Sequence, residues 1–204
     1  MFYAENQTDR YLRETFFPGR DNGVMIEVGA AGPTFLSMSR HFRESGWTVL
    51  AIEPNPHFIA QHAAAGLNVL PFACGDRDAD GVDFEMVHQP VAYAGGEISY
   101  ESFSALKVTA GYREHNPSIS TTTIKVNLRR LDTILRDCGV RAVDLLSVDV
   151  EGWELQVMDG LTVNPSVVVL ENFLRDPSYA LYMRRRGYYF YSEHFPNHVF
   201  ARRS

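Results

Sequence analysis

Two glycines, Gly29 and Gly32, follow a short apolar run near the start of the chain. Glycine lets the backbone approach a ligand closely, and the helix expected after this loop would turn its N-terminus toward the same place. The spacing differs from the G-x-G-x-x-G run of the dinucleotide sites used in hydride transfer. The loop therefore predicts a ligand with a polar tail and disfavours a nicotinamide cofactor.

An acidic residue, Glu53, ends the next apolar run. A carboxylate there can accept hydrogen bonds from both hydroxyl groups of a ribose, so the glycine loop and Glu53 together predict a nucleoside. Cys74, Gly75 and Asp76 follow the third run, where an adenine would lie in such a sheet. The alternatives are a tight turn with a solvated strand end, and a Cys74 that is only a small buried apolar residue.

Four polar residues follow two later apolar runs, namely Asp149, Glu151, Glu171 and Asn172. Neighbouring parallel strands lie ~5 Å apart, so groups at their carboxyl ends can converge. Three carboxylates at one edge of a sheet require an explanation, and a divalent cation bound by hard oxygen ligands is one.

Two histidines, His194 and His198, bracket the expected C-terminal hairpin. A histidine near a reaction site can act as a general base at neutral pH. Nothing in the sequence fixes the direction of either ring, so an exposed turn histidine is the favoured interpretation of each.

The elements that must position these residues alternate between buried strands and amphipathic helices. Strands are expected at 24–28, 48–52, 68–73, 143–148 and 166–170, and helices at 33–42, 56–64, 131–138, around 155–158 and at 178–186. This alternation is typical of a mostly parallel α/β sheet with helices on both faces. Two aromatic strands, 188–192 and 198–202, should form an antiparallel hairpin at one edge.

The segment 75–123 interrupts the alternation. Val82, Phe84 and Met86 are spaced as in a half-exposed strand, and the remainder is rich in Gly, Ser and Thr. We interpret the segment as a lid or insertion on the ligand side of the sheet.

The composition limits the classes of function. A chain of 204 residues, 45% of them hydrophobic, can bury one core, so a single domain spanning 1–204 is expected. Its net charge of -6 would repel a phosphate backbone, which argues against nucleic acid as a partner. The sequence has no apolar run long enough to span a membrane and no signal-peptide pattern, so a cytoplasmic protein without a membrane partner is expected.

Four segments together resemble the FkbM family of methyltransferases over nearly the whole chain: IEVGAAGP, AIEPNP, LRRLDTIL and DLLSVDVEGWELQVMDG. The D-V-E-G-x-E-L core of the last is the most specific, and VVVLEN also fits. The resemblance implies a Rossmann-like class I methyltransferase with a seven-stranded sheet, and S-adenosylmethionine bound across the carboxyl ends of the strands. The cofactor-binding residues it implies are Glu27, Gly29, Ala30, Gly32, Glu53, Pro54, Asn55, Cys74, Gly75, Asp76 and Asp149.

Methyl transfer from a sulfonium is an in-line displacement, so the protein mainly positions the acceptor oxygen and helps to remove its proton. The candidate catalytic residues are Asp149, Glu151 and His194. A divalent cation such as Mg²⁺, held by Asp149, Glu171 and Asn172, would lower the pKa of the acceptor.

The alternative to a cation site assigns the acidic groups other tasks. Glu151 and Glu154 would stabilise the start of their own helix through its dipole, while Asp149 recognises the cationic end of the cofactor. Both interpretations remain open.

The expected activity is O-methylation of a hydroxyl group on a small-molecule, sugar or natural-product acceptor. An NAD-dependent oxidoreductase and a non-catalytic nucleotide-binding domain are the alternatives. The aromatic terminal edge, with Phe195 and Phe200 nearby, is a candidate surface for a homodimer.

Overall fold

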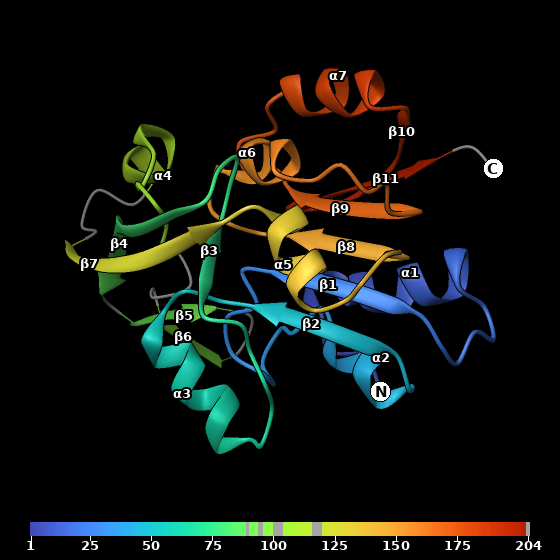
Figure 1. The fold of residues 1–204 in the computed structure, drawn as a ribbon, viewed down its shortest axis with the longest axis horizontal. Helices are drawn as coiled ribbons and strands as arrows, with labels where there is room; N and C mark the ends of the chain where they lie inside the picture. Colours follow the sequence, from blue (N-terminus) through green and yellow to red (C-terminus); the bar gives the residue numbers. More distant parts are fainter. Residues whose placement is uncertain (89, 94–95, 100–103, 116–119, 203–204) are drawn as a thin grey trace.

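The computed structural model describes residues 1–204 except 89, 94–95, 100–103, 116–119 and 203–204. Within this described part, six strands form the main sheet in the order β10-β11-β9-β8-β1-β2 (Figure 1). Their bounds are β1 (Val24–Val28), β2 (Thr48–Ile52), β8 (Leu145–Val148), β9 (Val167–Glu171), β10 (Tyr188–His194) and β11 (Asn197–Arg202). Strands β2, β1, β8 and β9 are parallel, and β11 and β10 continue the sheet antiparallel.

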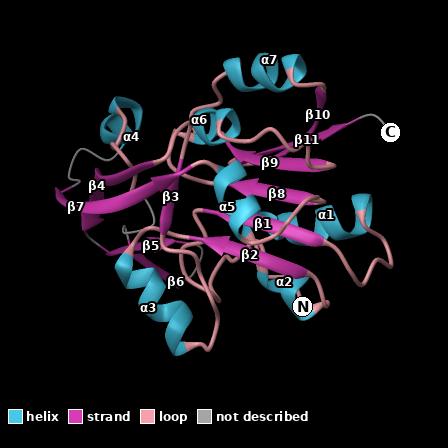
Figure 2. Cartoon of the chain, viewed as in Figure 1, coloured by secondary structure: helices cyan, strands magenta, loops and turns pink. Residues whose placement is uncertain are grey.

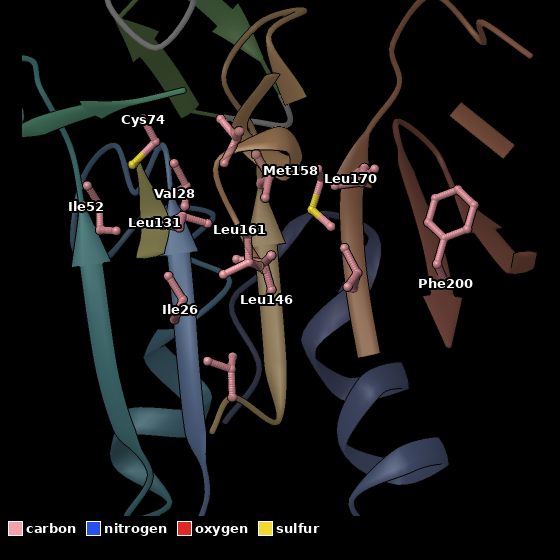
Figure 3. Packing of buried hydrophobic residues seen from close by; sticks show 14 of the residues in the cluster. Ile26, Val28, Ile52, Cys74, Leu131, Leu146, Met158, Leu161, Leu170 and Phe200 are labelled. Atoms are coloured by element: carbon pink, nitrogen blue, oxygen red, sulfur yellow. The ribbon is translucent and has the colours of Figure 1, made fainter. Parts of the chain in front are cut away.

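Helices cover both faces of the main sheet because its strands are apolar on both sides. On one face, Ile26 and Val28 pack with the helices α5 (Leu131–Asp137), α6 (Glu154–Asp159) and α7 (Ser178–Arg185). Figure 3 shows this layer, where Leu131 and Met158 lie over Val28, Leu146 and Leu170. The described segments thus have the predicted mixed α/β architecture with a mostly parallel sheet.

The opposite face packs on the N-terminal part of the chain. Met25 contacts a cluster that includes Leu12 of α1 (Thr8–Phe16), Phe42 of α2 (Arg40–Glu44) and Trp47, and all four side chains are buried. Full burial of such side chains contributes roughly 1.5–3 kcal/mol each. The short 3-10 turn η1 (Glu5–Gln7) precedes α1 and brings Glu5 toward the carboxyl ends of the strands.

Among the described residues the main sheet has six strands rather than the predicted seven. The third predicted strand, 68–73, contacts β2 only through an isolated bridge between Leu70 and Ile52. Pro71 has no N–H to continue the pairing, and the N–H of Phe72 turns back to the carbonyl of Leu70 at 2.9 Å. The chain then enters β3 (Phe72–Cys74), which joins a second sheet in the order β3-β7-β4.

The helix predicted from Pro33 through Phe42 is also wrong in most of its length. Only α2, which begins at Arg40, is helical, and Leu36 has a left-handed φ of 53°. The buried carboxylate of Glu27 explains the late start, because it accepts hydrogen bonds from the N–H groups of Met38 and Ser39 at 2.9 and 3.2 Å. A buried charge needs such donors, and the loop rather than a helix supplies them.

The segment 75–123 contributes a second layer of structure beyond the carboxyl ends of the parallel strands (Figure 2). It contains β4 (Ala79–His88), β5 (Pro90–Tyr93), β6 (Gly96–Ser99), α4 (Ala110–His115) and the start of β7 (Ser120–Arg129). The half-exposed strand predicted around Phe84 is confirmed as β4, which pairs antiparallel with β7. Parts of this segment, 89, 94–95, 100–103 and 116–119, lie outside the described residues.

The remaining helix after β2, α3 (Pro56–Ala64), begins as the sequence predicts. Asn55 is its N-cap, and its side-chain oxygen accepts the N–H of His57 at 2.9 Å. Among the described helices, none is long and apolar enough to cross a membrane.

Candidate functional site

A first cavity lies where β1, β2 and β8 end, beneath the second sheet. Its empty volume is about 630 Å³, open solvent included. Its apolar walls include Phe58, Phe72 and Phe84, and its polar lining includes Glu53 and Asp149. An apolar slot with a few fixed carboxylates suits a flat ring with a polar tail.

Gly29 allows the closest backbone approach at this site. Its φ is 78°, and a Cβ there would lie 1.7 Å from the backbone oxygen of Asp149. The loops after β1 and β8 can therefore touch only because residue 29 is glycine. This contact brings Asp149 to the floor of the cavity.

Glu53 is held rigidly at the end of β2. One carboxylate oxygen accepts the N–H of Ala31 at 2.9 Å, and the other accepts the N–H of Asn55 at 2.8 Å. Each oxygen retains a second lone pair, so the carboxylate can still accept two ligand hydroxyl groups. Burial raises the pKa of Glu53 to about 7, an effect that these two hydrogen bonds partly offset.

Ala31 is fixed from both sides. Its φ of 43° is left-handed, which costs a residue with a side chain roughly 1–2 kcal/mol. Glu53 accepts its N–H, and the Nε2 atom of the buried His62 lies 2.9 Å from its carbonyl oxygen. Buried groups thus hold the glycine loop in a conformation that it would not adopt alone.

The other sequence-predicted residues around this cavity divide into two groups. Pro54 and Cys74 line it, and burial raises the pKa of the Cys74 thiol above its ordinary value. Gly75 instead packs against Gly160, and Asp76 is paired with Arg77 at 3.0 Å on the surface. Asn55, as the buried cap of α3, supports Glu53 rather than lining the cavity.

A second cavity of about 1360 Å³, open solvent included, adjoins the first. Glu27, Ala30 and Gly32 line it, together with apolar side chains that include Phe35 and Phe173. Six residues line both cavities, and three of them, Gly29, Asp149 and Glu151, are called the junction below. No lysine, arginine or histidine among the described residues lines either cavity, so the charge at the junction is negative.

The structure brings together three of the predicted carboxylates. Oxygen atoms of Asp149, Glu151 and Glu171 all lie within 4.8 Å of one another. Asn172, the third predicted ligand, lines neither cavity. Its amide instead bonds to the backbone of Asp176, donating to the carbonyl at 3.0 Å and accepting the N–H at 2.8 Å.

Asp149 occupies the open side of this carboxylate cluster. Solvent in the cavity reaches its side chain, whereas Glu151 and Glu171 are each only 6% exposed. Enclosure by protein and then the charge of Glu154 raise the pKa of Asp149. Hydrogen bonding with Glu171 partly offsets this rise in the pKa of Asp149. The cluster is therefore suited to bind a positive charge or to accept a proton.

The predicted histidines lie away from this cluster. The ring of His194 stacks on Tyr11 with centroids 4.0 Å apart, and burial lowers its pKa. His198 lies 3.3 Å from the amide of Asn172 and contacts Phe190. Neither histidine lines either cavity, so His194 is not positioned as a catalytic base.

A family model for the methyltransferase FkbM domain matches residues 27–190, which include every junction residue. This chain belongs to the FkbM methyltransferase family. Membership implies a cofactor of the S-adenosylmethionine type in general.

One solved structure supports the FkbM fold. The methyltransferase FkbM from Methylobacillus flagellatus KT matches with a TM-score of 0.51 and 13% sequence identity, covering 95% of this chain and 50% of that chain. At this identity the likeness establishes the fold alone, and the chain spans half the length of that structure. No curated protein matches the sequence at a significant level.

The sequence did not predict the structural roles of two glutamates at this site, Glu5 and Glu154. Glu5 lines the second cavity, although it lies before the family match begins. Glu154, which is 1% exposed, accepts the N–H groups of Val150 and Gly152 and so shapes the loop that carries Glu151. The position of Glu154, just after the D-V-E-G turn, is a sequence signal for its bonds to the loop. No sequence pattern indicates that Glu5 lines the cavity.

Proposed function

We propose that this FkbM family member is an S-adenosylmethionine-dependent methyltransferase that methylates a hydroxyl group. The observation that carries the proposal is the meeting of two cavities at the junction. One cavity has a carboxylate suited to ribose and the other has space for an acceptor. Methyl transfer needs these two ligands to approach one another at a single point.

The residues present fit the cofactor. Glu53 offers free lone pairs for two ribose hydroxyl groups, and the apolar wall with Phe72 and Cys74 suits adenine. The cofactor would supply a methyl group bonded to a cationic sulfur. Asp149 and Glu151 at the junction provide negative charge that would stabilise such a cation. No basic residue among the described ones lines either cavity, so nothing there opposes this attraction.

Asp149 is the residue best placed to take the acceptor proton. Its side chain is open to the cavity, and its raised pKa makes it a better proton acceptor near neutral pH than an ordinary aspartate. Glu151 and Glu171 complete the cluster. His194 is not needed in this scheme because it lies against Tyr11.

The second cavity supports an acceptor that is partly apolar. Phe35, Leu36 and Phe173 supply apolar surface, while Glu5 and Glu171 add negative charge. Such a lining favours neutral or cationic small molecules and sugars, and it disfavours phosphorylated ones. The negative charge of Asp149, Glu151 and Glu171 could be balanced by a divalent cation instead of the cationic sulfur of the cofactor.

Isothermal titration calorimetry with S-adenosylmethionine tests the proposal, with wild type beside Glu53→Ala. The wild type should bind, and the variant should lose about tenfold or more in affinity because both ribose contacts disappear. Titrations repeated with Mg²⁺ and with a chelator show whether binding of the cofactor depends on a divalent cation. Absence of binding by the wild type under every condition would contradict the proposal.

A further inference from the structure

The loop between β8 and α6 has an unusual backbone at the junction. Glu151 has a φ of 60° and Gly152 has a φ of 96°, so two successive residues are left-handed. Glycine adopts this conformation readily, but glutamate does not. Something outside the residue must hold Glu151 in place, since its carboxylate points into the carboxylate cluster.

Glu154 is the group that holds this turn. One of its carboxylate oxygens accepts the N–H of Val150 at 3.0 Å and the N–H of Gly152 at 3.1 Å. These two N–H groups belong to the residues on either side of Glu151, so Glu154 fixes the peptide unit that follows the left-handed residue and the one that precedes Val150. Glu154 is 1% exposed and does not line either cavity.

Tyr179 of α7 completes the arrangement. Its hydroxyl group donates to the other carboxylate oxygen of Glu154, and its side chain is 8% exposed. The bond orients the carboxylate so that its first oxygen faces the loop. A buried carboxylate with three donors is a fixed acceptor, because any rotation would leave it without partners.

A second tyrosine-carboxylate bond joins α7 to α6 and can be compared with the bond between Tyr179 and Glu154. Tyr182, one turn further along α7, donates to Asp159 of α6 at 2.6 Å. This second tyrosine-carboxylate bond also joins α7 to α6, but it is exposed and lies at the far end of α6 from the loop. A purely structural role for the first bond predicts that the two bonds are equivalent.

We propose that Glu154 and Tyr179 are positioning residues for methyl transfer, which hold the backbone of Glu151 so that its carboxylate stays at the junction beside Asp149. The inference rests on the proposed function. Tyr179 lines neither cavity and acts on the site through its bond to Glu154, so the proposal gives α7 an indirect role in positioning Glu151.

Four variants test the positioning role: Glu154→Ala, Glu154→Gln, Tyr179→Phe and the control Tyr182→Phe. Amide hydrogen exchange of Val150 and Gly152, followed by NMR without ligand, reports the turn itself. Glu154→Ala should accelerate exchange at both amides about tenfold, the loss expected from one hydrogen bond, and Tyr179→Phe should do so less. Tyr182→Phe should leave both amides unchanged.

Calorimetry on the same variants reports the consequence for the site. Glu154→Ala should weaken S-adenosylmethionine binding about tenfold while leaving 5′-methylthioadenosine, which lacks the charged sulfur, nearly unaffected. Glu154→Gln should rescue binding, because its amide oxygen can accept both N–H groups and its NH₂ can donate to Tyr179. This rescue separates positioning from the charge of Glu154.

Distinct outcomes contradict the two ideas. Wild-type exchange at Val150 and Gly152 in Glu154→Ala would overturn the positioning role, and so would equal effects of Tyr179→Phe and Tyr182→Phe. Equal loss of both ligands in Glu154→Ala and Glu154→Gln would indicate general unfolding and also overturn it. If the wild type binds neither ligand, the proposed function fails, and with it the role in methyl transfer, whereas the exchange data still decide whether Glu154 fixes the turn.

Discussion

Glu53 shows how a single residue can be costly to the fold and useful to a ligand. It is 5% exposed, and burial raises its pKa to about 7, so near neutral pH the empty site holds a mixture of the acid and the carboxylate. Only the carboxylate can accept hydrogen bonds from both ribose hydroxyl groups, because the protonated acid uses one oxygen as a donor. Binding of a nucleoside should therefore release a proton.

This residue predicts a pH dependence of binding. The affinity for uncharged 5′-methylthioadenosine should rise about tenfold between about pH 6 and about pH 8, because the ionised fraction of a group with a pKa near 7 rises by that factor. Calorimetry across this range measures it. The matched variant Glu53→Gln should bind weakly at every pH, and an affinity of the wild type that is flat with pH would contradict the prediction.

At the scale of elements, the site depends on two loops that interlock at the ends of adjacent strands. The loop after β1 crosses the loop after β8 where Gly29 meets the backbone of Asp149. Each loop is also anchored from behind by a buried acid, Glu53 for the first and Glu154 for the second. Each loop contains a left-handed residue other than glycine, Ala31 in the first and Glu151 in the second, and the anchoring acid offsets the cost of that conformation.

The interlock predicts different costs for alanine at two glycines. Gly29→Ala should lower the free energy of unfolding by about 3 kcal/mol and abolish cofactor binding, because its Cβ collides with the backbone of Asp149. Gly66→Ala is the control, since Gly66 has a similar φ of 68° with open space around it. It should cost only about 1 kcal/mol and leave binding intact. Urea unfolding measures both, and equal losses would contradict the steric argument.

At the scale of the whole molecule, the main sheet has one aromatic edge. Strand β10 ends the sheet, and its exposed aromatic side chains Tyr189, Phe190 and Tyr191 are 38%, 47% and 43% exposed. An edge strand presents unpaired backbone groups, so a second copy is a natural partner for it. The cavities lie at the carboxyl ends of the parallel strands, so such pairing would leave them open.

We expect the protein to form a homodimer through β10. Phe190→Lys should convert the dimer to a monomer, because a charge at the edge opposes strand pairing. Leu181→Lys is the matched control, since Leu181 is 53% exposed on α7 rather than on the edge. Sedimentation analysis measures the mass of each. A monomeric wild type, or dissociation of both variants, would contradict pairing through this strand.

The sequence alone predicted the strands that carry the site, because buried parallel strands are continuous apolar runs that periodicity detects. Val24–Val28 and Thr48–Ile52 have the predicted bounds, and the two strands that end near Asp149 and Glu171 differ by only one or two residues. The local signal at Asn55 was equally readable, since capping depends on neighbouring residues. Gly29 was readable from its residue type, although the backbone that it approaches, at Asp149, is distant in the sequence. These signals placed Glu53 and Asp149 at the carboxyl ends of the sheet.

Contacts between distant segments decided the rest. The helix predicted around Phe35 is replaced by a loop because Glu27 draws the N–H groups of Met38 and Ser39 to itself, a demand that no local pattern expresses. Strand β7 was missed although Ile124, Val126 and Leu128 alternate with polar residues, since its partner β4 lies some 40 positions earlier. Which carboxylates meet was also a tertiary outcome. Strands β8 and β9 lie side by side in the sheet, and this pairing brings Asp149 and Glu151 together with Glu171. Sequence spacing alone does not determine such side-chain directions.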